Sequence, residues 1–197
     1  KTYKQMSYHP AINAAITLYS SMIAKARYRI VAPKNATEEE KRQAEILGEM
    51  LFEDMDHPFE DVVQDALTIT TYGFSVAEKV YRKRNKASGS LFDDELIAPK
   101  KIAIRRQTSI DKFVFSEDGN DIKGVKQNIV SDSMNRFSNR GNTIIIPRSK
   151  FLLFTTGDTK DNPYGISPLR NVYLPYKYLS AIEELEAQGV QKELTGV

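Results

Sequence analysis

The sequence of 197 residues contains no cysteine and no tryptophan. The absence of cysteine excludes disulfides and thiolate metal sites, and it fits folding in a reducing compartment. No apolar run approaches the roughly 20 residues of a membrane span, so we expect no membrane partner. The phosphate-binding pattern Gly-x-x-x-x-Gly-Lys is also missing, which argues against a motor ATPase. We therefore expect no cofactor and no bound metal.

Neither positive nor negative charge is in large excess. The chain has 28 lysines and arginines and 26 acidic residues, which gives a formal net charge of +2. A protein that grips nucleic acid through its phosphates is usually strongly basic, whereas one that merely encloses nucleic acid needs no such excess. The hydrophobic content of 41% suits a globular protein with one sizeable core. Because the chain opens on Lys1 rather than methionine, we expect a segment of a longer protein.

The most informative local feature is a stretch rich in turn residues, Asn162 to Leu169. Pro163 fixes its φ angle, and Gly165 permits a backbone conformation that other residues avoid. Ser167 and Pro168 are typical of the N-cap and the first position of a helix. None of these side chains is suited to catalysis, so the stretch predicts a rigid joint that aims the following helix.

The helix predicted after this joint carries an apolar stripe of Leu169, Val172, Tyr173, Tyr176, Leu179 and Ile182. Pro175 lies inside it, where the ring removes a backbone hydrogen bond, so we predict a kink or a break that costs roughly 3 kcal/mol in isolation. Tyr173, Tyr176 and Tyr178 have rings that can stack on bases. Their helical spacing beside leucine and valine favours core or subunit contacts instead.

The first third of the chain has a helical period. One helix is predicted from Pro10, and a short strand over 28–32 follows it. Thr37 and Glu40 form a capping box that opens a second helix, which His57-Pro58 ends. A third helix runs from Phe59 to Tyr72, and Gly73 supplies the usual left-handed stop.

At Gly73 the period changes to two, which predicts a strand with Phe74, Val76, Glu78 and Val80 on one face. Asp118-Gly119 predicts a hairpin turn. Further strands are expected over 101–106, 112–116, 122–130, 143–146 and 151–155, with loops over 82–90, 131–142 and 157–162. The order of elements predicts an α+β fold in which N-terminal helices pack on a mainly antiparallel β-region. We expect an α+β domain over 1–165 and a helix, 166–197, that leaves it.

Three stretches, in this order and spacing, resemble the portal (head–tail connector) proteins of tailed bacteriophages, closest to the Mu-like branch. Residues 72–81 are similar to that family's Gly-Phe-Ser-x-x-Glu strand, 146–154 to its Pro-x-x-Lys-Phe segment, and 162–169 to its Pro-x-Gly-x-Ser/Pro-Leu turn before a helix. Two departures are visible. Tyr81 stands where the family often has tryptophan, and the family's chain is longer, with a clip, a second stem helix and often a crown.

The resemblance implies a mechanical function. Such proteins close a ring of identical subunits, commonly a dodecamer, at one capsid vertex of the virion after assembly in the bacterial cytoplasm. The ring passes double-stranded DNA without reading its sequence, and it docks the terminase, the capsid and the tail adaptors. By this resemblance the segment is the wing with a helix that leads toward the stem, and it catalyses no reaction.

Several charged residues are candidates for assembly contacts. The basic run 82–86 and the acidic cluster of Glu53, Asp54, Asp56, Glu60 and Asp61 could meet between neighbouring subunits or could simply be solvated faces. Glu78 shares a strand face with apolar residues, so we hypothesise a pair with Arg106 that fixes strand register. Alternatively Glu78 reaches solvent at the sheet margin. Arg136 and Arg140 could touch DNA if their loop faces the channel.

Two other functional classes stay open. Asp111, Asp121 and Lys123 have the spacing of a metal-dependent nuclease around a hairpin, although short patterns of this kind often arise by chance. The two histidines, His9 and His57, lie beside prolines and are expected to be exposed. A non-viral scaffolding or adaptor domain of the same fold would differ from a portal in forming no ring.

Overall fold

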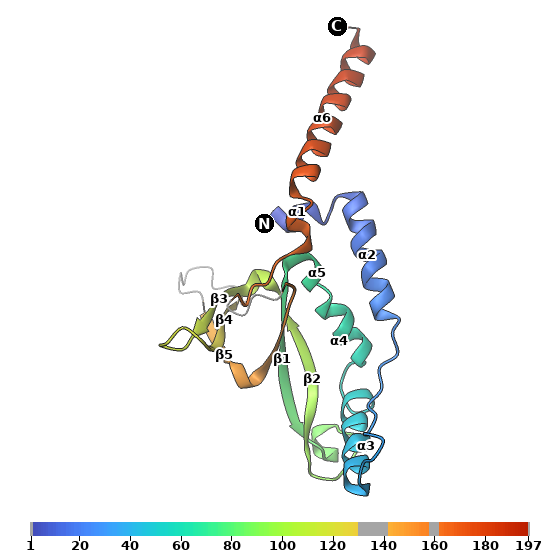
Figure 1. Ribbon diagram of the computed structural model, residues 1–197, viewed down its shortest axis with the longest axis vertical. Helices are drawn as coiled ribbons and strands as arrows, with labels where there is room; N and C mark the ends of the chain where they lie inside the picture. Colours follow the sequence, from blue (N-terminus) through green and yellow to red (C-terminus); the bar gives the residue numbers. More distant parts are fainter. Residues whose placement is uncertain (1, 130–141, 158–161, 197) are drawn as a thin grey trace.

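The computed structural model describes residues 2–129, 142–157 and 162–196 (Figure 1). Its helices are α1 (Thr2–Met6), α2 (Pro10–Ala24), α3 (Glu38–Phe52), α4 (Phe59–Ala66), α5 (Ile69–Tyr72) and α6 (Tyr173–Thr195). Its strands are β1 (Phe74–Lys83), β2 (Ile97–Arg105), β3 (Ile110–Phe115), β4 (Ile122–Ile129), β5 (Asn142–Pro147) and β6 (Phe151–Thr155). Short 3₁₀ turns are η1 (Lys86–Ser88), η2 (Gln107–Ser109), η3 (Arg148–Lys150) and η4 (Pro168–Arg170). The α+β prediction is confirmed.

The strands form two antiparallel sheets, with the orders β2-β1-β6 and β3-β4-β5. Phe74, Val76 and Phe151 from the first sheet pack against Phe113, Val125 and Ile146 from the second. The main apolar core therefore lies between the sheets. The chain leaves one sheet and joins the other at η3, since β5 pairs with β4 and β6 pairs with β1.

The predictions that rest on neighbouring residues are confirmed. The Thr37 hydroxyl accepts a hydrogen bond from the Glu40 amide at 3.3 Å, and the Glu40 carboxylate accepts one from the Thr37 amide at 2.7 Å. Gly73 ends α5 with φ at 90°. The Asp118-Gly119 turn joins β3 to β4, with φ of Gly119 at 74°.

Three expectations about the helices and strands are wrong. The helix predicted over 59–72 is divided into α4 and α5, because the chain turns at Leu67-Thr68. The strand predicted over 28–32 belongs to neither sheet and lies between α2 and α3 (Figure 1). The loop expected from Arg82 begins two residues later, because Arg82 and Lys83 still pair with β2. Most of the loop predicted over 131–142 lies outside the described residues.

The C-terminal helix projects from the body of the molecule (Figure 1). The Ser167 hydroxyl accepts a hydrogen bond from the Leu169 amide at 3.2 Å and so caps η4, and α6 starts three residues after η4 ends. The kink or break predicted at Pro175 is therefore wrong, because α6 runs through Pro175 and the interruption lies earlier, between η4 and α6. Pro175 is the third residue of α6, where a backbone N–H has no partner within the helix, so its ring causes no kink. Among the described residues, no helix combines the length and apolarity needed to cross a membrane.

Candidate functional site

The predicted joint brings two glycines into direct contact. Gly165 has φ at 58°, and a Cβ atom added to it would lie 2.2 Å from the carbonyl oxygen of Gly73 and 2.7 Å from that of Thr156. A Cβ on Gly73 would lie 2.8 Å from the Ser167 amide nitrogen. Both positions thus need glycine for conformation and for space. The start of β1 and the turn before η4 pack backbone against backbone.

Hydrogen bonds hold this contact from both sides. The Thr156 amide donates to the Gly73 carbonyl at 2.8 Å, and the Thr156 hydroxyl lies 2.8 Å from the Ile166 carbonyl. The Ile166 amide donates back to the Thr156 carbonyl at 2.6 Å. The buried Ser167 hydroxyl donates to the Thr71 carbonyl at 2.7 Å. The end of β6, the end of α5 and the turn before η4 form one fixed unit.

The aromatic ring of Tyr164 extends the joint into the core. It contacts Phe74 and Phe113 edge to face, with centroid distances of 5.6 and 5.0 Å. Pro163, next to it, is buried. Because Phe74 belongs to the first sheet and Phe113 to the second, Tyr164 anchors the turn before η4 to both sheets at once.

A further contact steadies α6 beyond the joint. His9, just before α2, lies edge to face with Tyr176 at 5.7 Å, and its Nε2 lies 3.4 Å from the Glu183 carboxylate. The side chain of His9 is only 13% exposed, so the prediction that it is exposed is wrong, whereas His57 is exposed as predicted. The N-terminal segment therefore supports the first turns of α6. Tyr173 and Tyr178 remain accessible, at 38% and 67%.

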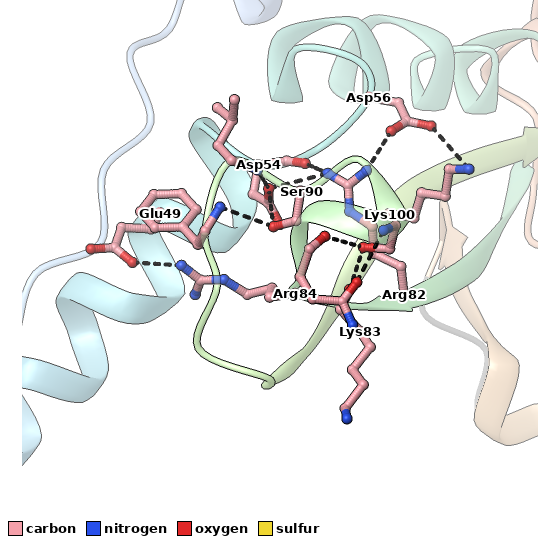
Figure 2. Close-up of polar contacts among 12 residues, drawn as sticks. Glu49, Asp54, Asp56, Arg82, Lys83, Arg84, Ser90 and Lys100 are labelled. Carbon is pink, nitrogen blue, oxygen red and sulfur yellow. Dashed lines mark hydrogen bonds and ion pairs between the residues drawn. The ribbon is translucent and has the colours of Figure 1, made fainter.

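At the opposite end of the β1–β2 hairpin, charged side chains form a polar cluster (Figure 2). Asp54, which is 1% exposed, lies 3.2 Å from the Arg82 guanidinium and accepts hydrogen bonds from the Ser90 hydroxyl at 2.8 Å and the Leu91 amide at 2.9 Å. Arg82 also reaches Asp56 at 3.0 Å. This cluster ties the end of α3 to the tip of the hairpin.

Arg84 is the second cation of the cluster and is fully buried. Its guanidinium lies 2.9 Å from Glu49 and 3.2 Å from Asp94, and it stacks over the Phe92 ring at 4.1 Å. Nearby, hydrogen bonds from Lys83 and then Asn85 lower the pKa of Glu95. The hypothesis that residues 82–86 meet the acidic cluster of a neighbouring subunit is therefore wrong for Arg82, Asp54 and Asp56, which pair within one chain.

Glu78 is paired, but its partner is Arg105 rather than Arg106. The Arg105 Nε donates to the Glu78 carboxylate at 2.7 Å, and a guanidinium nitrogen contacts the same oxygen. The register explains the choice, since Val76 faces Arg105 and Glu78 faces Ala103, which places Glu78 and Arg105 on one sheet face. Arg106 follows the end of β2 and is exposed. The pair joins strands β1 and β2.

The geometry of the β3–β4 hairpin contradicts the nuclease hypothesis. Asp111 lies near the end at which Ile110 faces Gln127, and it pairs with Lys126 at 3.4 Å. Asp121 lies at the other end, where its carbonyl accepts from the Ser116 amide. Five residues of strand separate the backbone at Asp111 from that near Asp121 by roughly 16 Å, too far for the two carboxylates to share a metal ion. Lys123 is exposed on β4, and no group of three or more potential ligands occurs among the described residues.

The sequence matches the family model for the portal protein of Mu bacteriophage over residues 1–188. The chain belongs to this family of phage portal proteins. A comparison with curated protein sequences gives no match. The family model covers nearly the whole length of the chain and assigns it to the portal family. This assignment is consistent with the resemblance at residues 72–81, 146–154 and 162–169.

A solved structure supports the fold of this portal chain. The chain is similar to one in the virion of a native gene transfer agent particle, with a TM-score of 0.62 and 12% sequence identity. The alignment covers 93% of this chain and 42% of that chain. The portal segment thus spans less than half the length of the virion protein that it resembles in fold.

Sequence reasoning missed several residues that build the joint and the polar cluster. Thr156 bonds to both sides of the joint, yet a single threonine at a strand end gives no signal. Arg84 lies in the charged loop between β1 and η1, where the sequence gives no sign that this side chain is buried. The spacing of 28 residues between Asp54 and Arg82 gives no local pattern. The residues predicted for DNA contact, Arg136 and Arg140, lie outside the described residues.

Proposed function

We propose that this chain is the wing and the start of the stem in a ring of identical subunits at the portal vertex of a virion. The ring surrounds the channel through which double-stranded DNA enters and leaves, and it offers docking surfaces for the terminase, the capsid and the tail adaptors. Membership of the Mu portal family is the observation that carries this proposal. The nearly balanced charge fits a channel that encloses DNA without reading its sequence.

The rigidity of the joint supports the proposed mechanical role. In a closed ring each subunit meets its neighbours through two different surfaces, so a small error in the shape of one subunit is repeated at every interface. A helix attached through a flexible linker would leave that shape undefined. Here the Gly73–Gly165 contact, Thr156 and Tyr164 fix the direction of α6 relative to the sheets. This role supports our proposed division into a wing, 1–165, and a stem-directed helix, 166–197.

The surface of α6 also supports a role in assembly. Its exposed apolar side chains include Leu174, Tyr178, Ile182 and Leu185, all at least 51% exposed. On a helix these four residues fall on one face, because their spacings are four, four and three. Exposed apolar patches of this kind mark sites of contact with other proteins. A neighbouring stem helix in a ring would provide such a contact.

The experiment uses the full-length parent chain, purified and imaged by negative-stain electron microscopy. We expect closed rings with a central channel, commonly with twelvefold symmetry as in the family. The Gly165→Val variant should give incomplete or heterogeneous rings, while Gly119→Val, at an open hairpin turn, should leave them intact. A parent chain that stays monomeric at high concentration, and that fails to support DNA packaging, would refute the proposal.

A further inference from the structure

The joint fixes η4 against the sheets, but the ladder of backbone hydrogen bonds does not continue from η4 into α6. Among the described residues, the amides of Val172, Tyr173 and Leu174 donate to no backbone carbonyl. Pro175 has no N–H group, so the next bond is the one from the Tyr176 amide to the Val172 carbonyl at 3.0 Å. This stretch thus lacks the hydrogen bonds that stiffen a helix. The chain can bend here without breaking any of them.

Residues 2–9, which we call the N-terminal strap, lie beside the start of α6 (Figure 1). The strap is attached to the body of the molecule, because Met6 is fully buried and α1 lies against α5 and η4. The His9 amide donates to the Met6 carbonyl at 3.0 Å, and the His9 carbonyl accepts from the Asn13 amide at 2.8 Å. Backbone hydrogen bonds on both sides therefore hold His9 in place.

His9 is the point at which the strap contacts α6, and it does so at two heights along the helix. Its ring packs against Tyr176, and its Nε2 lies near the Glu183 carboxylate. Tyr176 and Glu183 are seven residues apart, which is two turns or roughly 10 Å of helix. Two contacts at different heights fix the angle of a helix, whereas one contact fixes only a point. In the described part of the chain, every aromatic pair and ion pair that joins α6 to residues outside it involves His9.

The contact between His9 and α6 can be released at little cost. Neither ring nitrogen of His9 has a hydrogen-bond partner among the described residues, so its separation from α6 breaks no hydrogen bond. The Glu183 side chain is 54% exposed, so water already solvates its carboxylate in part. A cavity of about 410 Å³ leaves room for movement between the strap and the base of α6. It is lined by Thr2, Tyr3, Arg170 and Tyr173.

From these observations we infer that the N-terminal strap sets the angle of α6, and that α6 pivots over residues 172–175 when His9 releases it. The helix has 23 residues and is roughly 35 Å long, so a pivot of about 10° moves its far end by about 6 Å. In the proposed ring, the same pivot in every subunit widens or narrows the channel. That consequence rests on the proposed function, whereas the strap and the pivot are properties of a single subunit.

The test measures the direction of α6 by double electron–electron resonance between two spin labels on the full-length chain. Lys112→Cys on β3 and Glu193→Cys on α6 place one label on a sheet and one near the far end of the helix, in a chain free of other cysteines. Labelled subunits are diluted with unlabelled ones, so that only distances within a subunit are measured. We expect one narrow distance in this labelled parent. His9→Ala should broaden the distribution by about 6 Å.

Matched variants separate the strap from general effects on the fold. His57→Ala is the control for His9→Ala, because His57 is the other histidine of the sequence and lies beside α4 and β2. His9→Phe keeps an aromatic ring beside Tyr176 and should restore most of the narrow distribution. Glu183→Ala removes the second contact at an exposed position, so it tests the strap even if His9→Ala does not fold. It should broaden the distribution to a smaller extent, and Glu184→Ala should not.

Three results would overturn the inference. A broad distribution in the labelled parent would show that the strap does not hold α6. A narrow distribution in both His9→Ala and Glu183→Ala would show that the joint alone fixes the helix. Equal broadening by His9→Ala and His57→Ala would mean a general loosening of the fold. If the full-length chain forms no ring, the proposed function fails, while the same distances in the free subunit still decide whether the strap holds α6.

Discussion

Gly165 is the residue at which the fold leaves least room for a side chain. Turn chemistry alone indicates a glycine with positive φ before a helix, and that part of the joint could be predicted from the sequence. The identity of the opposing atom, the Gly73 carbonyl 92 positions earlier in the sequence, depends on how β1 and β6 pair. Local sequence thus predicts that glycine is needed, and tertiary packing adds a second, independent reason.

Gly165→Ala should lower the free energy of unfolding by roughly 2–4 kcal/mol. About 1–2 kcal/mol comes from the left-handed backbone, and the rest from the contact of the new Cβ with the Gly73 carbonyl. Gly89→Ala is the control, since Gly89 has a φ of 76° but nothing within 4 Å of its added Cβ. Denaturant unfolding measures both variants. Equal losses would show that backbone conformation alone matters at the joint.

Glu78 and Arg105 should be energetically coupled, by about 1–2 kcal/mol in a double-mutant cycle with Glu78→Gln and Arg105→Gln. Their side chains are 20% and 33% exposed, so water screens the pair only in part. The same cycle with Arg106→Gln should give no coupling, because Arg106 lies outside the paired register. Coupling of Glu78 to Arg106 instead of Arg105 would contradict the observed register.

At the scale of whole elements, the reliable predictions are those whose cause lies within a few residues. The capping box at Thr37, the stop at Gly73 and the Asp118-Gly119 turn are all of this kind. The division of six strands into two sheets could not be predicted, because each run has equal β character. Residues 28–32 have strand composition, but in the described part of the chain they belong to neither sheet, because composition alone does not supply a neighbouring strand.

The polar cluster should be a strong constraint on the hairpin tip. Asp54→Ala leaves the Arg82 charge without its buried partner and removes the acceptor for Ser90 and Leu91, so we expect a loss of about 3–5 kcal/mol. The Leu91 amide should also exchange faster with solvent. Glu45→Ala, at an exposed position on α3, should change stability by less than about 0.5 kcal/mol. A similar effect for both variants would mean that the cluster adds no specific stability.

Pro175→Ala should change the free energy of unfolding by less than about 1 kcal/mol, despite its position in a helix of 23 residues. The first intrahelical donor near the start of α6 is Tyr176, whose amide bonds to the Val172 carbonyl at 3.0 Å, so Pro175 replaces no bond. Ala187→Pro, in the helix interior, should cost roughly 3 kcal/mol or more and reduce the helical circular dichroism. A large effect of Pro175→Ala would place the interruption at the proline after all.

At the scale of the molecule, the centre of the chain is held by contacts between its own residues, whereas several peripheral elements expose apolar surface. The two sheets, the joint and the polar cluster are closed by contacts within one chain. The apolar stripe of α6, the uncharged helix α2 and the segment 28–32 are not. These open surfaces lie on different elements, as two unlike contacts per subunit require in a ring. In the proposed ring, these are the surfaces available for contact with neighbouring subunits.

The stripe on α6 provides the last prediction, which concerns assembly rather than folding. Leu185→Asp should leave the unfolding free energy of the subunit within about 0.5 kcal/mol, because the side chain is 67% exposed. In the full-length chain the same change would place a charge inside the proposed contact between stem helices, where an unpaired carboxylate is costly. Ring yield, measured by light scattering and electron microscopy, should fall sharply.

Glu184→Asp, on the same exposed helix, is the control and should assemble normally. Intact rings of Leu185→Asp would show that this stripe stays in water and that the ring is held together by the wings.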